Sequence, residues 1–111
     1  MSVVNAVLIP AKIAENAQTT QYTSTGVITV PDKFTATNYS TAVASLSVNL
    51  VTSLDTAGNQ NLVVKTKALQ PGETYTFPEI VGHYLAAGDF ISTLASAANA
   101  ISIRASGRTI T

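Results

Sequence analysis

His83 is the only histidine in this 111-residue chain, and it lies shortly before Asp89 and Ser92. A serine, a histidine and a carboxylate are the residue types of an acyl-transfer triad. However, the chain has no Gly-x-Ser-x-Gly motif, which would expose a nucleophilic serine at a tight turn. A histidine that packs or caps a crossover between strands explains His83 more simply than a catalytic base does.

Three carboxylates surround His83 in the sequence, those of Glu73, Glu79 and Asp89, and such groups can form the acid and base of a glycosidase. Glu73 and Asp89 each follow a glycine, where acidic side chains commonly bond their own turn backbone. Residues 55–61 lack the acidic density of a calcium loop, and there is neither a phosphate-binding glycine loop nor a cysteine. We therefore expect no enzyme activity, no metal or other cofactor and no small-molecule substrate.

Residues 70–90 contain His83 and the three carboxylates, and they also give the clearest indication of the fold. Pro71 and Gly72 favour a tight turn, and residues 74–77 then alternate as a strand that Pro78 should end. A second turn at residues 87–89 precedes a strand at 90–94. This order, in which a long connection joins two short strands, is typical of a chain that passes from one sheet of a sandwich to the other.

The other strand candidates are short apolar segments bounded by turn residues. They lie at residues 21–23, 27–30, 34–37, 45–50, 62–67 and 101–105. Pro31 and Asp32 should break the chain between two of them, and only residues 94–100 could form a helical turn. Leu46, Val48 and Leu50 alternate with polar residues, which predicts one buried and one solvated face. Seven or eight such strands predict an all-β fold, an antiparallel β-sandwich or jelly roll.

Residues 1–20 differ from the rest, because Pro10 follows a short apolar run and no clear periodicity comes after it. Two interpretations remain open for this segment. It is either an extended arm with apolar anchor points at Val7, Ile9 and Ile13, or the first strand of the sheet. Residues 21–111 then form a single domain, which suits the length of the chain.

Five further residues are candidates for a protein interface. Tyr22, Tyr39 and Tyr84 lie near predicted turns, where they could rim an interface or a sugar site. Arg104 and Arg108 are four residues apart and share one face of a strand. They either solvate an edge strand against aggregation or anchor a protein partner.

Charged residues form only 11% of the chain and cancel in number, whereas apolar residues form 46% and hydroxyl side chains are abundant. Nucleic acids and anionic membranes attract clustered Lys and Arg, so we expect neither as a partner. The N-terminus has no basic start followed by an apolar run, and no segment is long and apolar enough to span a bilayer. We expect synthesis in a reducing cytoplasm.

Residues 69–75 (Leu-Gln-Pro-Gly-Glu-Thr-Tyr) and 81–91 (Val-Gly-His-Tyr-Leu-Ala-Ala-Gly-Asp-Phe-Ile) resemble small structural proteins of tailed bacteriophages. In particular, the chain resembles the short jelly-roll capsid decoration proteins, also called staple or cement proteins, of some short-tailed phages. The resemblance runs from about Tyr22 to the C-terminus. The family has no catalytic residues, so none carry over.

The resemblance implies a virion protein, made in the bacterial cytoplasm, that binds the outer capsid surface across the seams between capsomers. Its partner would be the major capsid protein, and a homodimer on a local twofold could hold two equivalent sites. Two other functions stay open: another virion accessory domain of the neck, tail or fibre, and a carbohydrate-binding or adhesion module.

Overall fold

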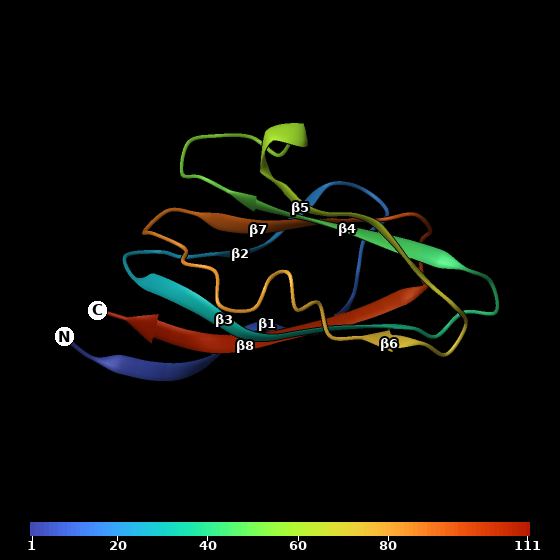
Figure 1. Cartoon of the computed structure of the whole chain (residues 1–111), viewed down its shortest axis with the longest axis horizontal. Coiled ribbons are helices and arrows are strands. Elements are labelled where there is room, and N and C mark those ends of the chain that lie inside the picture. The colour runs from blue at the N-terminus through green and yellow to red at the C-terminus, as the bar shows by residue number, and fades with distance from the viewer.

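In a computed structural model, which describes all residues from Met1 to Thr111, eight strands and one short 3-10 helix form two layers (Figure 1). The elements are β1 (Val3–Ile13), β2 (Thr19–Thr23), β3 (Ile28–Asn38), β4 (Ala44–Val51), η1 (Asn59–Asn61), β5 (Leu62–Leu69), β6 (Thr74–Tyr75), β7 (Phe90–Ala95) and β8 (Ile101–Ile110). The fold is therefore all-β, as the sequence predicts.

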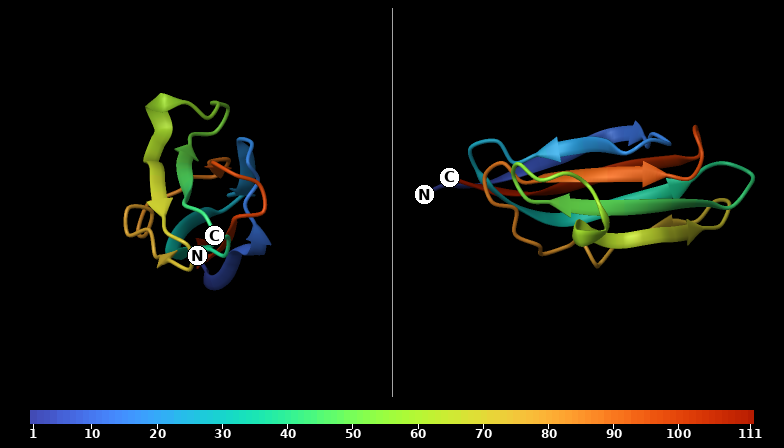
Figure 2. Two further views of the ribbon diagram at one scale, coloured as in Figure 1. Left: turned by 90° about the vertical axis from the view of Figure 1, so that its right-hand side faces the viewer. Right: turned by 90° about the horizontal axis from the view of Figure 1, so that it is seen from above.

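The two sheets each hold four antiparallel strands, in the orders β1-β8-β3-β6 and β2-β7-β4-β5 (Figure 2). The pairs β1 with β8, β2 with β7, β3 with β6 and β4 with β5 match the first half of the chain to the second half in reverse order. A long hairpin rolled over itself produces this pairing, and the added contacts of β8 with β3 and β7 with β4 complete the sheets. This strand order is that of a jelly roll.

The predicted crossover is confirmed, because β6 belongs to one sheet and β7 to the other. Both predicted turns are present. The N–H of Glu73 donates to the carbonyl of Gln70 at 3.0 Å, and the N–H of Asp89 donates to the carbonyl of Ala86 at 3.0 Å. Gly88 has a φ of 92°, which an L side chain rarely adopts.

The first residues form a strand and not a free arm. β1 pairs with β8 along its whole length, from Val3 opposite Ile110 to Ile13 opposite Ser102. Ser2 and the C-terminal Thr111 extend the ladder by exchanging two backbone hydrogen bonds, of 3.2 and 2.9 Å. Both termini therefore lie side by side at one end of the molecule (Figure 1).

The predicted break at Pro31 and Asp32 is wrong, because β3 continues through both residues. Pro31 pairs with Gly107 and Lys33 with Ser106, so Asp32 is the extra residue of a β-bulge. A bulge tolerates a proline because the regular ladder is interrupted there. The predicted helical turn at residues 94–100 is also wrong, since β7 extends to Ala95 and the helical turn lies at η1.

Apolar side chains from both sheets meet in one core. Phe34 and Phe77 have no exposed surface, and their rings meet edge to face with centroids 5.1 Å apart. Leu46 and Val48 point inward as predicted, and so do Ile101 and Ile103.

The other face of β4 is not solvated, which corrects the prediction for that strand. Asn49 is 2% exposed, and its Nδ2 donates to Gly58 O at 3.1 Å and to Asn61 Oδ1 at 2.8 Å. These bonds hold the segment around η1 against the outer side of the sheet. Asn49 therefore binds a covering loop instead of water, and Ser47 Oγ accepts the N–H of Thr66 in β5 at 2.8 Å.

Glu15 lies in the connection after β1 and gives the fold a small acid sensitivity. Lys12 Nζ donates to Glu15 Oε2 at 2.8 Å and Gln21 Nε2 donates to Oε1 at 2.8 Å. These two hydrogen bonds, that from Lys12 foremost, lower the pKa of Glu15 below its usual 4.5. The ionised form is favoured by folding, so its stabilisation is present above pH 4.5 and is lost as the pH falls through the lower folded-state pKa.

We expect Glu15→Gln to lower the melting temperature slightly at neutral pH and to match the original chain once Glu15 is protonated. The effect is modest because the Lys12 and Glu15 side chains are 36% and 41% exposed, where water screens the pair. Thermal melts of both chains from about pH 7 to about pH 3 test this. A difference that stays constant over the whole range would contradict it.

Candidate functional site

The three residues that could form a triad are not linked. Asp89 accepts backbone N–H groups on both oxygens, from Ser53 and Ala86 at 2.9 Å each. Ser92 is 2% exposed, and its hydroxyl donates to a backbone carbonyl of β2 at 3.1 Å. His83 lies exposed on the β6–β7 connection, and no hydrogen bond joins it to Asp89 or Ser92.

The remaining carboxylates near His83 also serve local structure. Glu73 Oε1 accepts the N–H of Gln70 at 2.8 Å, across the turn that Glu73 closes. Glu79 Oε2 accepts the hydroxyl of Tyr75 at 2.8 Å, and this bond raises the pKa of Tyr75. No three His, Cys, Asp or Glu side chains gather where they could hold a metal ion. No helix is long and apolar enough to cross a membrane.

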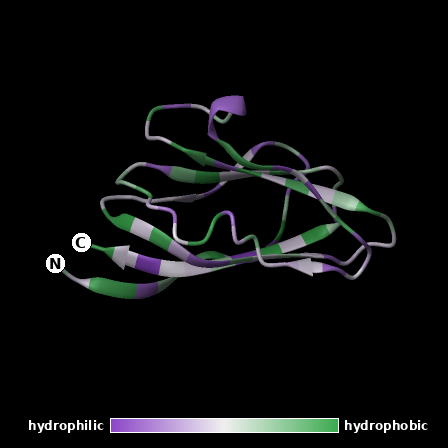
Figure 3. Cartoon of the chain, in the orientation of Figure 1, coloured by the Kyte–Doolittle hydropathy of each residue, from purple (hydrophilic) through white to green (hydrophobic).

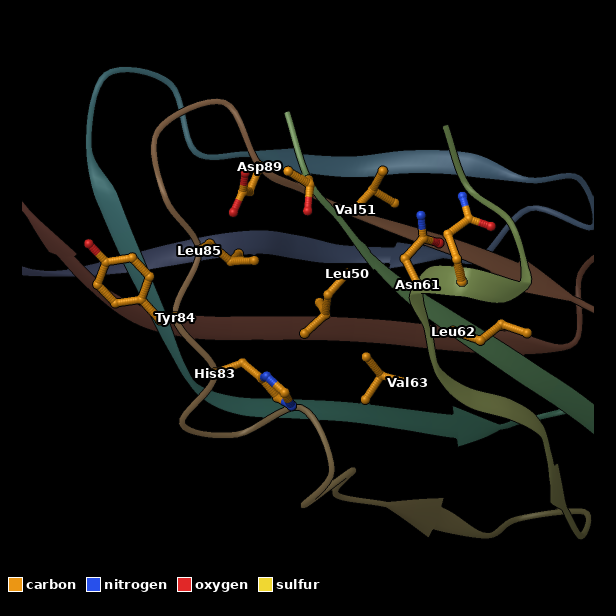
Figure 4. Close-up of a pocket in the computed structure, with 11 residues that line it drawn as sticks. Leu50, Val51, Asn61, Leu62, Val63, His83, Tyr84, Leu85 and Asp89 are labelled. Carbon is orange, nitrogen blue, oxygen red and sulfur yellow. The ribbon is translucent and has the colours of Figure 1, made fainter. Parts of the chain in front are cut away.

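A cleft of about 340 Å³ lies between the β6–β7 connection and the segment around η1 (Figure 4). Six of its eleven lining residues are hydrophobic and the other five are polar. The lining residues are Leu50, Val51, Thr52, Gln60, Asn61, Leu62, Val63, His83, Tyr84, Leu85 and Asp89. Figure 4 shows His83 turned toward Val63, with Tyr84 at the margin of the cleft. A small polar ligand in the cleft would therefore have a single tyrosine ring, that of Tyr84, to stack against.

Of the predicted interface residues, one is fully buried and another is partly buried. Ile9 has no exposed surface and packs in the core. Tyr22 packs against the core, and its hydroxyl shares a 2.7 Å hydrogen bond with the buried hydroxyl of Thr29. The interface prediction for Ile9 is therefore wrong. Tyr22 is partly exposed and has a structural role, and its interface role stays a prediction.

Tyr39 and Tyr84 are exposed, by 49% and 63%, but they lie far apart. Tyr84 precedes the bridge between Leu85 and Thr29 near the start of β3, whereas Tyr39 follows the last residue of that strand. Nine residues of strand separate these points by about 30 Å. Ile13, 46% exposed, lies at the same end of the sheet as Tyr39, because it pairs with Ser102, which pairs in turn with Thr37 on β3.

Val7, Arg104 and Arg108 do share one surface, the outer side of the β1-β8-β3-β6 sheet. Val7 pairs with Ser106 between the two arginines, and strand alternation places all three side chains away from the core. Arg108 binds Asp32 through Nε–Oδ1 and Nη2–Oδ1 contacts of 3.1 and 3.0 Å. β8 lies between β1 and β3, so the interpretation of its arginines as guards of an edge strand is wrong.

Sequence reasoning missed the apolar residues of this surface near the chain termini. Val3, Ile110 and Ile28 are opposite one another across β1, β8 and β3, and Val30 follows beside Arg108. We call this group, with Val7, the β1–β8 face: Val3, Val7, Ile28, Val30, Arg108 and Ile110. The hydrophobic colour at the start of β1 and β3 in Figure 3 marks part of it.

The start of β3 has an inverted pattern. Ile28 and Val30 point outward and are partly exposed, while Thr29 between them points inward with no exposed surface. The hydroxyl of Thr29 bonds to Tyr22 and, at 2.7 Å, to the buried Ser24. The usual arrangement of a half-buried strand places the apolar side chains inward. The outward pair of β-branched residues therefore adds apolar area to the outer face of the sheet, and the buried Thr29 hydroxyl is satisfied by its two hydrogen bonds.

A hollow of about 340 Å³ lies on this side of the sheet, lined by Asn5, Ala6, Val7, Asp32, Ser106 and Gly107. Asp32 neutralises Arg108, whereas Lys33, opposite Ser106, and Arg104 are exposed and form no salt bridge. Val3 and Val7 are 56% and 51% exposed. The β1–β8 face thus combines exposed apolar side chains, an arginine paired with Asp32 and a neighbouring hollow, and these features suit contact with another protein.

Comparison of the chain with models of protein families, with curated proteins and with solved structures finds no match.

Proposed function

We propose that the chain is a non-enzymatic virion protein that binds the outside of an assembled bacteriophage capsid across capsomer seams and stabilises the shell. Its partner is the major capsid protein, and it reaches the outer capsid surface after synthesis in the host cytoplasm. The observation that carries the proposal is the inverted start of β3, where Ile28 and Val30 point outward from the β1–β8 face. The jelly roll is compatible with this role by analogy, since viral coat proteins and lectins both use it.

A protein can stabilise the shell if its binding surface exists only after assembly. A rigid domain that binds two capsomers, and binds neither when they are apart, stabilises the assembled state by mass action. The partly exposed apolar side chains of the β1–β8 face supply buried area, and the Arg108–Asp32 pair supplies polar contact without net charge. Attachment of this kind should depend only weakly on salt.

Replacement of Val30 by aspartate is expected to weaken binding to capsid shells at least about tenfold, because it removes apolar contact and places a carboxylate in the covered surface, where Arg108, already bound to Asp32, offsets only part of the desolvation cost. Val30 lies within the sheet, away from its free edge. The measurement is co-sedimentation of the purified chain with assembled shells that lack it, followed by heat challenge of the shells. The matched control is Val43→Asp, because Val43 is a 56% exposed valine in the loop after β3.

Saturable binding that Val30→Asp weakens and Val43→Asp does not, with shells that then survive heating better, would support the proposal. Equal binding of both variants would move attachment to another surface. Failure of the original chain to bind shells would remove the capsid function, and binding to purified tails or necks instead would favour another virion accessory domain.

A carbohydrate-binding module is the second candidate, and the cleft beside His83 and Tyr84 favours it. Tyr84 is 63% exposed at the margin of the cleft, a position from which an aromatic ring can stack on a sugar. Binding to a glycan array that Tyr84→Ala abolishes, and that Val30→Asp leaves intact, would favour this function over the capsid.

A further inference from the structure

The first half of β1 is a sheet edge without the usual protection against pairing. β1 is the last strand of its sheet and pairs only with β8. Within residues 3–7 the register is regular, and no side chain is charged. Beyond residue 7 the strand has two register shifts and contains Pro10 and Lys12, which discourage pairing.

The other three edges are each blocked. β6 has only two residues, and β2 is a five-residue strand with a register shift between Thr20 and Tyr22. β5 carries Lys65 and Lys67, and Thr66 between them has a φ of 49° where the register against β4 shifts. Short strands, bulges and lysines are the devices that keep edges from pairing. The beginning of β1 is the exception.

The ladder shows which backbone groups of this edge are free. Ser2 and Thr111 exchange both of their hydrogen bonds, so the alternation of an antiparallel pair makes Val4 and Ala6 the next residues bonded to β8. The N–H and C=O groups of Val3, Asn5 and Val7 therefore point away from β8. No other strand lies on that side.

We propose that two copies of the chain pair through residues 3–7 of β1, antiparallel about a twofold axis at Asn5. Val3 then lies opposite Val7 of the second copy, Asn5 opposite Asn5, and about six backbone hydrogen bonds form. The β1-β8-β3-β6 sheets of the two copies then form one continuous sheet of eight strands.

A second copy is the occupant because the edge is complementary to itself. The same three residues supply the donors and the acceptors, and the twofold matches valine with valine, a favourable cross-strand pair. Asn5 meets Asn5, whose amides can bond each other. The nearest charge is Arg108, opposite Asn5 on β8, and Asp32 neutralises it, so two copies can approach without repulsion.

Pairing uses up the free edge of both copies, so it ends at a closed dimer and not a fibre. The contact is shorter than a standard interface, so the dimer should be weak, roughly micromolar. Within the proposed function a dimer would give paired attachment to the shell. The pairing is nevertheless tested on the chain alone, so its failure and the failure of shell binding are distinguishable.

Sedimentation equilibrium of the full chain is the first test. The mass should rise from 11.5 kDa toward twice that value as the concentration increases to several hundred micromolar. Asn5→Pro should weaken the association at least about tenfold, because it removes an N–H that points out of the sheet and leaves the bonds to β8 intact. Asn5→Ser, which keeps that N–H, should retain the dimer, and circular dichroism should show both variants folded.

Cross-linking then tests the register. The chain has no cysteine, so Asn5→Cys introduces one thiol, and hydrogen-bonded antiparallel partners lie about 5.5 Å apart at Cα, within disulfide range. Mild oxidation should link Asn5→Cys chains at least about ten times faster than chains with Asn59→Cys, an exposed position on η1. The double variant Val3→Lys with Val7→Lys should be monomeric, whereas Val3→Lys with Val7→Glu should still pair.

A chain that stays monomeric at several hundred micromolar overturns the proposal. So does a dimer that Asn5→Pro leaves unchanged, because it would use another surface. A monomeric chain whose shell binding Asn5→Pro abolishes would mean that the edge receives a strand of the capsid protein, which also overturns pairing between copies.

Discussion

Replacing Phe77 with alanine is expected to lower the free energy of unfolding by about 3–5 kcal/mol. The ring has no exposed surface and contacts two aromatic neighbours edge to face, with centroids 5.1 Å from Phe34 and 4.8 Å from Tyr75. Alanine removes both contacts and leaves a cavity between the sheets. Urea unfolding, followed by far-UV circular dichroism, measures the change.

The effect should extend to the β6–β7 connection, because Phe77 is its first buried anchor and Ile80 and Leu85 are the next. Hydrogen exchange at residues 80–86 should therefore rise more than exchange in β4. Tyr39→Ala is the control, since Tyr39 is 49% exposed and should change stability by less than about 0.5 kcal/mol. A loss below about 1 kcal/mol for Phe77→Ala would mean that the core repacks around the gap.

The features that the sequence predicts correctly depend on neighbouring residues. The turns at Gly72 and Gly88 follow from glycine, proline and acidic side chains within four residues of one another. The inward positions of Leu46 and Val48 follow from alternation along one strand. The crossover between sheets follows from two strands and the length of their connection.

The errors concern contacts between distant parts of the chain. Arg104 looked like an edge residue, but β8 is covered on one side by β1 and on the other by β3. Asn49 looked solvated, yet Asn61 and Gly58 bind it. Strand order and loop placement are set by the whole core, which alternation within one strand does not reveal.

Val7 and Ile9 show the same limit within the candidate site. The sequence predicts both as apolar anchor points of an extended arm, and in a regular strand two residues that are two apart share a face. A register shift between them turns Ile9 into the core and leaves Val7 51% exposed. A bulge is hard to predict from sequence, yet it moves the following side chains from one face of the sheet to the other.

The sequence predicts the alternation at the start of β3 but not its inverted orientation. The segment Ile28-Thr29-Val30 alternates cleanly, but alternation gives two faces without saying which one is inside. The hydroxyls of Tyr22 and of the buried Ser24 decide it, since they satisfy Thr29 and allow the two apolar residues to point outward. The proposed capsid surface and the proposed β1 pairing lie on adjoining parts of this sheet, so a dimer would present two such surfaces side by side.

Gly107 on β8, beneath that surface, is where one added methyl group should cost the most. We expect Gly107→Ala to lower the free energy of unfolding by about 3 kcal/mol. A Cβ at this position would overlap the carbonyl oxygen of Val30 and lie 3.0 Å from both Leu8 Cδ1 and Pro31 Cα. The backbone of β3 cannot withdraw without disturbing the ladder that joins it to β8.

Chemical denaturation of Gly107→Ala and of Ser106→Ala, the neighbour whose side chain points outward, separates this steric effect from a general effect of alanine in β8. Ser106→Ala should change stability by less than about 0.5 kcal/mol. Trimming Leu8 in the Gly107→Ala background should not restore stability, because the first obstacle is a backbone oxygen and not a side chain. If Leu8→Ala does restore it, side-chain crowding and not the close approach of β8 to β3 requires glycine here.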